Sequence, residues 1–180
     1  LPYTEFGEVS RGDTVHSSGW LGVENRQWHH EWGASMVIRD AVENDLEGLL
    51  LLYTQLHKKS MPAIDPSLHR LWSSICADEN HHVLVAEEDR SIVSSCVVVI
   101  VPNLTHGQRP YALVENVVTD EAHRRRGLAS ACLSRAREIA EHDRCYKIML
   151  MTGSKDPAVL AFYRSAGYND VDKTAFIQWL

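Results

Sequence analysis

Residues 123–130, HRRRGLAS, place three consecutive arginines directly before a glycine and a run of small side chains. The stretch lies between an expected strand and an expected helix, so Gly127 stands at the N-terminus of that helix. A helix N-terminus exposes unpaired N–H groups at the positive end of the helix dipole and therefore attracts anions. The arrangement predicts a phosphate-binding loop, while a solvated basic turn is the alternative that these residues leave open.

Glu115 is a second candidate, because it introduces a carboxylate into the otherwise apolar strand ALVENVV. A carboxylate at such a position must be paired, hydrated or functional. Alternation along a strand puts Glu115 on the same face as Val117, with Asn116 on the opposite face. Glu115 is therefore a candidate general base or amine-binding group, and a structural partner role is the alternative.

Periodicity indicates the elements that must position these residues. The first helix is expected to be capped by Asn44, with Glu47 in capping-box spacing. Strands are expected at residues 36–41, 82–88, 91–101, 110–118, 145–151 and 174–180, and helices at residues 43–57, 65–78, 127–141 and 156–167. The order indicates an α/β protein with a mixed sheet, built from a hairpin in one half and from crossovers in the other.

The composition is typical of a single globular domain. The chain has 180 residues, of which 44% are hydrophobic and 23% charged, and its formal net charge is −6. The chain shows no apolar run near the ~20 residues of a membrane span and no secretory signal pattern. Its acidity and its lack of basic rows disfavour a nucleic-acid partner.

Cysteine and histidine usage bounds the metal and redox chemistry. The four cysteines, Cys76, Cys96, Cys132 and Cys145, stand in apolar contexts and form no CxxC pair, so buried free thiols in a reducing cytoplasm are expected. The adjacent histidines at positions 29–30 and 81–82 have no second ligand pair at metal spacing. They are expected to be structural, and no metal site is predicted.

Two stretches resemble the motifs of one enzyme family. Residues 114–133, VENVVTDEAHRRRGLASACL, resemble motif A of the GCN5-related N-acetyltransferases, the GNAT superfamily. Arg124, Gly127 and Ala129 fill its Arg/Gln-x-x-Gly-x-Gly/Ala signature. Residues 145–168, CYKIMLMTGSKDPAVLAFYRSAGY, resemble motif B. The resemblance spans about residues 36–180. Within the superfamily, these stretches are similar to the glucosamine-6-phosphate N-acetyltransferases and related small-molecule enzymes.

The resemblance implies a fold and a cofactor. In the GNAT fold, helices flank a central mixed, mostly antiparallel sheet whose fourth and fifth strands splay apart around acetyl-CoA. The arginine loop would hold the pyrophosphate, and the preceding strand would lie beside the pantetheine arm. The implied cofactor-binding residues are Val117, Val118, Thr119, Arg124, Arg125, Arg126, Gly127, Leu128, Ala129, Ser130 and Phe162.

Two residues depart from the family pattern. Arg125 replaces a residue that is often small, which adds charge to the loop but takes space. Asp156 stands where relatives often carry an Asn that binds the cofactor. Because a carboxylate would repel phosphates, a helix-capping role is expected for Asp156.

Acetyl transfer to an amine makes three chemical demands. The amine must lose a proton, since a free alkyl amine has a pKa of ~10.4, and Glu115 is the candidate base. N–H donors near Val117 or Val118 would stabilise the oxyanion. Tyr163 is the candidate acid for the departing thiolate, and a core aromatic role beside Phe162 is the alternative.

Residues 1–35 are expected to form an N-terminal extension that contains Trp20, Trp28 and Trp32, and residues 36–180 form the acetyltransferase domain. The predicted protein is a cytoplasmic, homodimeric N-acetyltransferase that acts on a small-molecule amine, such as an amino sugar or amino-sugar phosphate. Residues 57–66 would line the acceptor site, where two lysines suit an anionic acceptor. A protein or peptide N-acetyltransferase and a CoA-binding module without turnover are the alternatives, and neither a membrane nor a nucleic-acid partner is expected.

Overall fold

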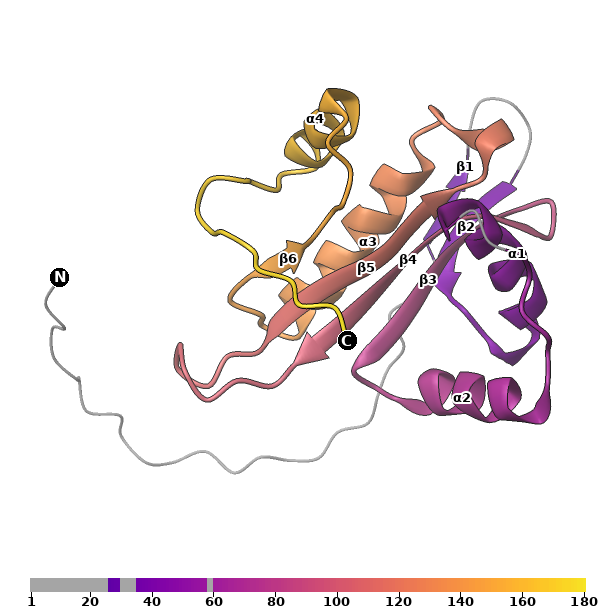
Figure 1. Ribbon diagram of the computed structural model, residues 1–180, viewed down its shortest axis with the longest axis horizontal. Helices are drawn as coiled ribbons and strands as arrows, with labels where there is room; N and C mark the ends of the chain where they lie inside the picture. Colours follow the sequence, from indigo (N-terminus) through magenta and orange to yellow (C-terminus); the bar gives the residue numbers. More distant parts are fainter. Residues whose placement is uncertain (1–25, 30–34, 58–59) are drawn as a thin grey trace, which may run out of the picture.

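The part of the chain that the structure describes forms a six-stranded sheet whose strands follow one another in sequence order (Figure 1). The computed structural model describes residues 26–29, 35–57 and 60–180. The strands are β1 (Arg26–His29), β2 (Ser35–Asp40), β3 (His81–Glu88), β4 (Ser91–Val101), β5 (Tyr111–Thr119) and β6 (Ile148–Leu150). Neighbouring strands are antiparallel except β5 and β6, which are parallel. The expected mixed, mostly antiparallel sheet is confirmed.

Helices cover both faces of this sheet. They are α1 (Leu46–His57), α2 (Pro66–Ala77), α3 (Leu128–His142) and α4 (Pro157–Ser165), with short 3-10 helices η1 (Glu43–Asp45) and η2 (Glu121–His123). Leu49 and Trp72 place α1 and α2 in one buried cluster with Val85 of the sheet. Cys132 of α3 and Tyr163 of α4 pack with a second cluster on the opposite face.

The start of α1 differs from the sequence-based prediction. The chain forms η1 before α1, and the Val42 N–H donates to the Asp45 carboxylate at 2.7 Å. The predicted capping box of Asn44 and Glu47 is therefore wrong. Burial alone would raise the pKa of Asp45, but its hydrogen bonds and the charge of Arg39 outweigh burial and lower that pKa. Asp45 thus ties the first helix to β2.

The sheet begins inside the segment assigned to the N-terminal extension. β1 pairs antiparallel with β2, and Trp28 lies opposite Met36 in this register. Trp20 and Trp32 lie outside the described residues, as do all of residues 1–25. Arg26–His29 and Ser35 of this segment are thus part of the sheet, and a separate role for residues 1–25 stays a prediction.

The predicted final strand at residues 174–180 is wrong. That segment joins no strand, and its Phe176 and Trp179 are 92% and 88% exposed. Aromatic and β-branched residues favour a strand only where a neighbouring strand supplies cross-strand contacts, and no described strand pairs with this segment. β6 is likewise shorter than the predicted strand, because its pairing with β5 is short.

β5 and β6 diverge where the site was expected. Their pairing runs from Ala112 opposite Ile148 to Val114 opposite Leu150 and stops there. β5 continues to Thr119, whereas the chain beyond β6 turns toward α4 (Figure 1). The expected splay is thus confirmed. It lies between the fifth and sixth strands, and not between the fourth and fifth, because β1 adds one strand before the strands that the sequence predicted. Within the described chain, the β6 side of β5 has no paired strand beyond Val114.

Candidate functional site

A β-bulge shapes the open edge of β5. The register against β4 shifts between Ser95 and Val97, and Asn116 takes a left-handed φ of 51°. Glu115 lies opposite Val97 on the side of α1 and α2, whereas Val117 packs with the core on the side of α3. The predicted common face of Glu115 and Val117 is therefore wrong, because the bulge interrupts the alternation on which it rested.

The end of β5 is held firmly to β4. Val118 is buried, and Ser94 Oγ donates to its carbonyl oxygen at 2.8 Å. The same hydroxyl lies 2.8 Å from Thr119 Oγ1. These contacts fix one side of the strand that was predicted to lie beside the pantetheine arm. Its other side stays open beyond the β6 pairing.

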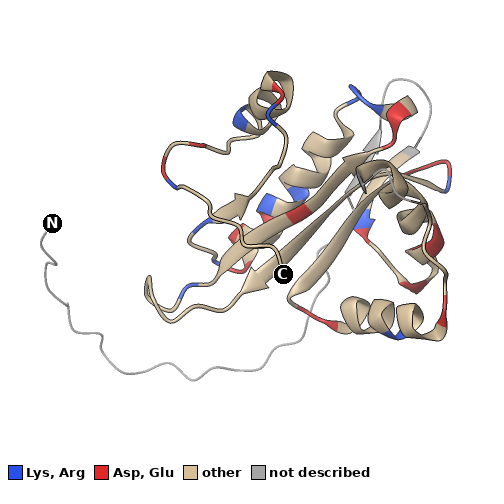
Figure 2. Ribbon diagram, viewed as in Figure 1, with Lys and Arg blue, Asp and Glu red and all other residues tan. Residues whose placement is uncertain are grey.

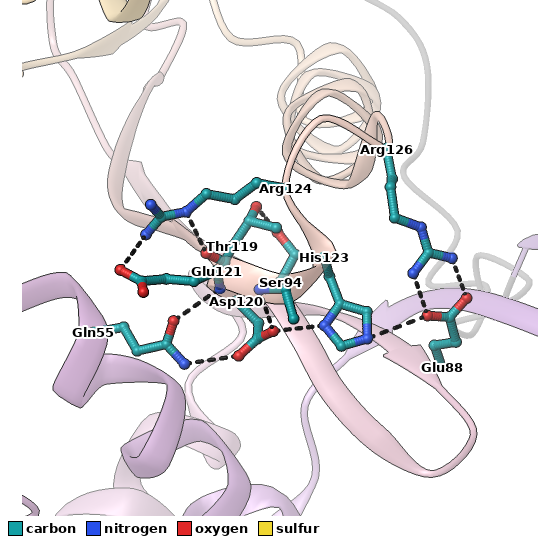
Figure 3. Close-up of polar contacts among 10 residues, drawn as sticks. Gln55, Glu88, Ser94, Thr119, Asp120, Glu121, His123, Arg124 and Arg126 are labelled. Atoms are coloured by element: carbon teal, nitrogen blue, oxygen red, sulfur yellow. Dashed lines mark hydrogen bonds and ion pairs between the residues drawn. The ribbon is translucent and has the colours of Figure 1, made fainter.

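Asp120 organises the turn that follows β5 (Figure 3). Its carboxylate accepts from the Ala122 N–H at 3.0 Å and from Gln55 Nε2 at 2.7 Å, and it lies 2.6 Å from His123 Nδ1. The Gln55 side-chain oxygen accepts from the Glu121 N–H at 3.0 Å. The Gln55 and His123 hydrogen bonds lower the pKa of Asp120, Gln55 contributing more. The turn is thereby attached to α1.

The three arginines that follow are placed differently. Arg126 donates two hydrogen bonds, of 2.9 and 2.6 Å, to the carboxylate of Glu88. Arg124 makes a longer contact of 3.3 Å to the Thr119 carbonyl oxygen. Arg125 is exposed and takes a left-handed φ of 61°. The loop thus presents Arg124 and Arg125 toward solvent, while Arg126 already binds a carboxylate.

Gly127 begins α3 with a left-handed φ of 80° and no side-chain cap. A Cβ added there would meet no atom within 4 Å, so open space adjoins the helix N-terminus. Leu128 is 2% exposed and its side chain belongs to the core. Ala129 is half-buried and Ser130 is exposed. Uncapped N–H groups, small side chains and open space together fit an anionic group such as a pyrophosphate.

Tyr163 lies on α4 among aromatic neighbours. Its ring centroid is 5.1 Å from that of Phe162 and 6.3 Å from that of Tyr168. Burial raises the pKa of Tyr163, and electrostatic effects of Cys96 and Glu115 raise it further. The two predicted catalytic residues come from different elements and lie toward different faces of the sheet, Glu115 on the side of α1 and α2 and Tyr163 on the side of α3.

Asp156 caps α4, as its expected role required. Its side chain accepts from the Ala158 N–H at 2.8 Å, and Pro157 occupies the first helical position. The carboxylate is thus engaged in the cap. Lys58 and Lys59, which were predicted to favour an anionic acceptor, lie outside the described residues.

Three residues of the loop network were not singled out from the sequence. Asp120 carries a local signal, because an Asp directly before a short helix is a common N-cap. Gln55 and Glu88 carry none, since their partners lie 65 and 38 positions away in the chain. Contacts of that separation depend on the tertiary fold and cannot be read from local spacing.

A cavity of about 830 Å³ lies at the C-terminal end of α3, away from the arginine loop. Arg135 is the one arginine or lysine on its described wall. Six carboxylates line it: Asp40, Asp78, Glu79, Glu138, Glu141 and Asp143. Figure 2 shows a basic segment instead in the loop that enters α3. Charge therefore favours the loop, and not this cavity, for a phosphate ligand.

The described residues also bear on metal, membrane and thiol chemistry. They hold no cluster of three or more His, Cys, Asp or Glu side chains suited to a metal ion. None of their helices combines the length and the apolar character that crossing a membrane requires. All four cysteines are free, but Cys76 is exposed on α2 and Cys145 is only half-buried, so the prediction of four buried thiols is wrong for these two.

Comparison with known proteins gives a consistent result. The model of the acetyltransferase (GNAT) family matches residues 25–168. A glucosamine 6-phosphate N-acetyltransferase of Trypanosoma brucei brucei is 35% identical over 77 residues, which are 43% of this chain and 50% of that protein. A probable glucosamine 6-phosphate N-acetyltransferase 2 of Oryza sativa subsp. japonica is 32% identical over 146 residues, which are 77% of this chain and 84% of that protein.

Solved structures agree in fold. A protein described as a candidate acetyltransferase from Agrobacterium tumefaciens str. C58 superposes with a TM-score of 0.75 at 40% identity, over 79% of this chain and 99% of that one. An aminoglycoside N-acetyltransferase in complex with CoA superposes with a TM-score of 0.67 at 17% identity, over 84% of this chain and 99% of that one. At 17% identity the likeness concerns the fold alone.

Proposed function

Because the chain belongs to the acetyltransferase (GNAT) family, we propose that it transfers an acetyl group from acetyl-CoA to the primary amine of a small molecule. It is an acyltransferase by family, and GNAT enzymes use acetyl-CoA. The acetyl donor and the acceptor of this chain are the parts that we infer.

The observation that supports acetyl-CoA most directly is the position of two features beside each other. β5 loses its β6 partner after Val114, and five residues later the chain enters the turn that leads to Gly127 and α3. An open strand edge can pair with the amides of a pantetheine arm, and an uncapped helix N-terminus can bind a pyrophosphate. One extended ligand that contains both groups satisfies both features.

For the acceptor we propose an amino sugar, with an amino-sugar phosphate first. Two relatives at 35% and 32% identity are named glucosamine 6-phosphate N-acetyltransferases, which supports this choice. The first of them is matched over only half of its length. The substrate of the chain therefore has to be found by assay.

The proposed chemistry assigns one proton transfer to each of two residues. The amine nitrogen attacks the thioester carbonyl, a C–N bond forms, and the C–S bond breaks. Glu115 accepts the proton that the amine loses, directly or through water. Tyr163 donates its hydroxyl proton to the leaving sulfur, and its raised pKa keeps that proton in place at neutral pH. Backbone N–H groups near Val117 and Val118 stabilise the oxyanion.

A melting experiment tests the cofactor. Acetyl-CoA and CoA should both raise the melting temperature, because a ligand that binds only the folded state adds about 2.7 kcal/mol of stability at a concentration of 100 Kd. Plain CoA should act nearly as strongly as acetyl-CoA, since the phosphates and the pantetheine arm are common to both. No shift at millimolar concentration of either would contradict the proposed function.

A panel of amines tests the acceptor. Release of CoA thiol should be measured with glucosamine 6-phosphate, glucosamine, an aminoglycoside and a peptide with a free amino terminus. The proposal expects the highest kcat/KM for an amino sugar. Highest activity with the peptide would support the alternative of a peptide N-acetyltransferase, and binding of acetyl-CoA without turnover of any amine would favour a binding module.

A further inference from the structure

We infer that Arg126 is a positioning residue, which holds the phosphate loop against the β3–β4 hairpin through Glu88 and does not itself bind phosphate. This inference rests on the proposed function, since it concerns the same loop. It corrects the equal treatment of the three arginines that the sequence alone suggests.

Glu88 has the properties of an anchor for the loop. It is the last residue of β3, directly before the two-residue turn into β4, so the sheet fixes its position. The residue is only 8% exposed. Its two carboxylate oxygens face the two terminal nitrogens of Arg126 at 2.6 and 2.9 Å, a bidentate arrangement (Figure 3). A nearly buried carboxylate needs such a partner, because burying an unpaired charge is costly.

A second contact joins this anchor to the other end of the loop. His123 Nε2 lies 3.6 Å from Glu88, and His123 Nδ1 lies 2.6 Å from Asp120. Asp120 is itself bound to Gln55 of α1. The chain from residue 120 to residue 126 is therefore held at both ends, by α1 on one side and by the hairpin on the other (Figure 3).

The remaining arginines are free to serve the ligand. The side chains of Arg124 and Arg126 are similarly exposed, at 52% and 44%, but those of their partners differ: that of Glu121 is itself 72% exposed and 3.4 Å from Arg124, whereas that of Glu88 is 9% exposed and 2.6 Å from Arg126. The exposed pair of Arg124 and Glu121 contributes little and exchanges easily for a phosphate. Arg125 is also exposed. The three arginines therefore have different roles. Arg124 and Arg125 contact phosphate, and Arg126 fixes the loop backbone, whose N–H groups also contact phosphate.

Two substitutions separate positioning from direct binding. Arg126→Lys keeps the positive charge, so a lysine could still bind phosphate if Arg126 does so. A lysine cannot, however, form the bidentate hydrogen bonds to Glu88. Glu88→Gln removes a negative charge near the loop and releases Arg126. Both electrostatic effects of Glu88→Gln favour an anion, so weaker binding of CoA by this variant at an unchanged ligand-free melting temperature reflects lost positioning.

The experiment measures CoA affinity by calorimetry, together with the melting temperature of the ligand-free protein. Arg126→Lys and Glu88→Gln should each weaken CoA binding about tenfold, which corresponds to one lost charged hydrogen bond. The double variant should be no weaker than the worse single variant, because both remove the same interaction. With a substrate in hand, KM for acetyl-CoA should rise while kcat changes less than about threefold.

Matched controls come from another Arg–Glu pair on α3. Arg137 and Glu141 are 2.7 Å apart and well exposed. Arg137→Lys and Glu141→Gln make the same chemical changes away from the loop and should leave CoA affinity unaltered. They distinguish a specific effect from a general change of net charge.

Each result has one meaning. Tighter binding by Glu88→Gln, or unaltered binding by Arg126→Lys, would overturn the inference and make Arg126 a phosphate ligand or a bystander. Pantetheine, which lacks the pyrophosphate, is measured as a second ligand. A lower ligand-free melting temperature together with an equal loss of affinity for CoA and for pantetheine would also overturn the inference. If the parent protein binds no CoA, the proposed function fails instead, and that result is distinct from the other two.

Discussion

The two ends of α3 present opposite chemistry to solvent. At the N-terminal end, Gly127 opens the helix without a cap beneath a loop of three arginines. At the C-terminal end, Glu138, Glu141 and Asp143 line a cavity of about 830 Å³. The helix dipole acts in the same sense as these side chains, since its N-terminus attracts anions and its C-terminus attracts cations.

This difference shows that the size of a hollow does not identify the site of a phosphate-bearing cofactor. The acidic cavity has the wrong charge for phosphates, and the loop has the right charge with uncapped N–H groups. A ligand as long as acetyl-CoA needs an open edge along which to lie more than it needs an enclosed volume. β5 supplies that edge where its pairing with β6 ends.

The largest expected effect concerns the hydroxyl of Tyr163 on α4. Tyr163→Phe keeps the ring and its contacts with Phe162 and removes only the proton donor. Turnover should fall roughly 10²–10⁴-fold, the usual range for a lost general acid. CoA affinity and melting temperature should change little. Normal turnover with a lower melting temperature would instead make Tyr163 a core aromatic.

The pH dependence sharpens the same test. A tyrosine ordinarily titrates near pH ~10, and burial raises the pKa of Tyr163 above that value. The hydroxyl therefore stays protonated at lower pH, and the parent should lose activity through this group only as pH rises beyond 10. Tyr163→Phe should lack that alkaline loss. A profile measured on both proteins with the same acceptor checks this.

The second effect concerns binding at the helix N-terminus. Gly127→Asp should place a carboxylate against the pyrophosphate and weaken CoA binding tenfold or more, a cost of at least ~1.4 kcal/mol. Gly127→Asn is the matched control, because Asn has the same shape, carries no charge and tolerates a left-handed φ better than most residues. A large gap between the two variants supports the anion site, and equal affinities would place the phosphates elsewhere.

The sequence was most informative where function depends on neighbours in the chain. The spacing of Arg124, Gly127 and Ala129 and the cap at Asp156 are local features, and the structure has the loop, the helix starts and the cap as they predict. The splay of two strands was available only through family resemblance.

The errors share one physical cause, which is that tertiary partners decide them. The predicted alternation of side chains along β5 is interrupted at Asn116, because a bulge against β4 adds a residue. No local sequence pattern indicates this bulge. The strand predicted at residues 174–180 lacks a neighbour to pair with. The bond from Arg126 to Glu88 joins residues 38 positions apart, so nothing in the RRR run could distinguish its third member from the others.

The smallest effect is expected at the C-terminal end of α3, and it tests whether the two ends act independently. Asp143→Asn removes one carboxylate from the acidic cavity. Gly127 and Asp143 flank the helix and are 16 positions apart, so about 24 Å separate them at 1.5 Å per residue. The Debye length is about 8 Å at physiological ionic strength, and a charge at that distance is largely screened. CoA affinity should therefore stay within about twofold of the parent, both at 0.15 M salt and above it.

A change of more than about threefold that persists in high salt cannot be explained by a screened charge. It would mean that the cavity and the phosphate loop are mechanically coupled through α3, and the contrast between the two ends would then describe one site and not two.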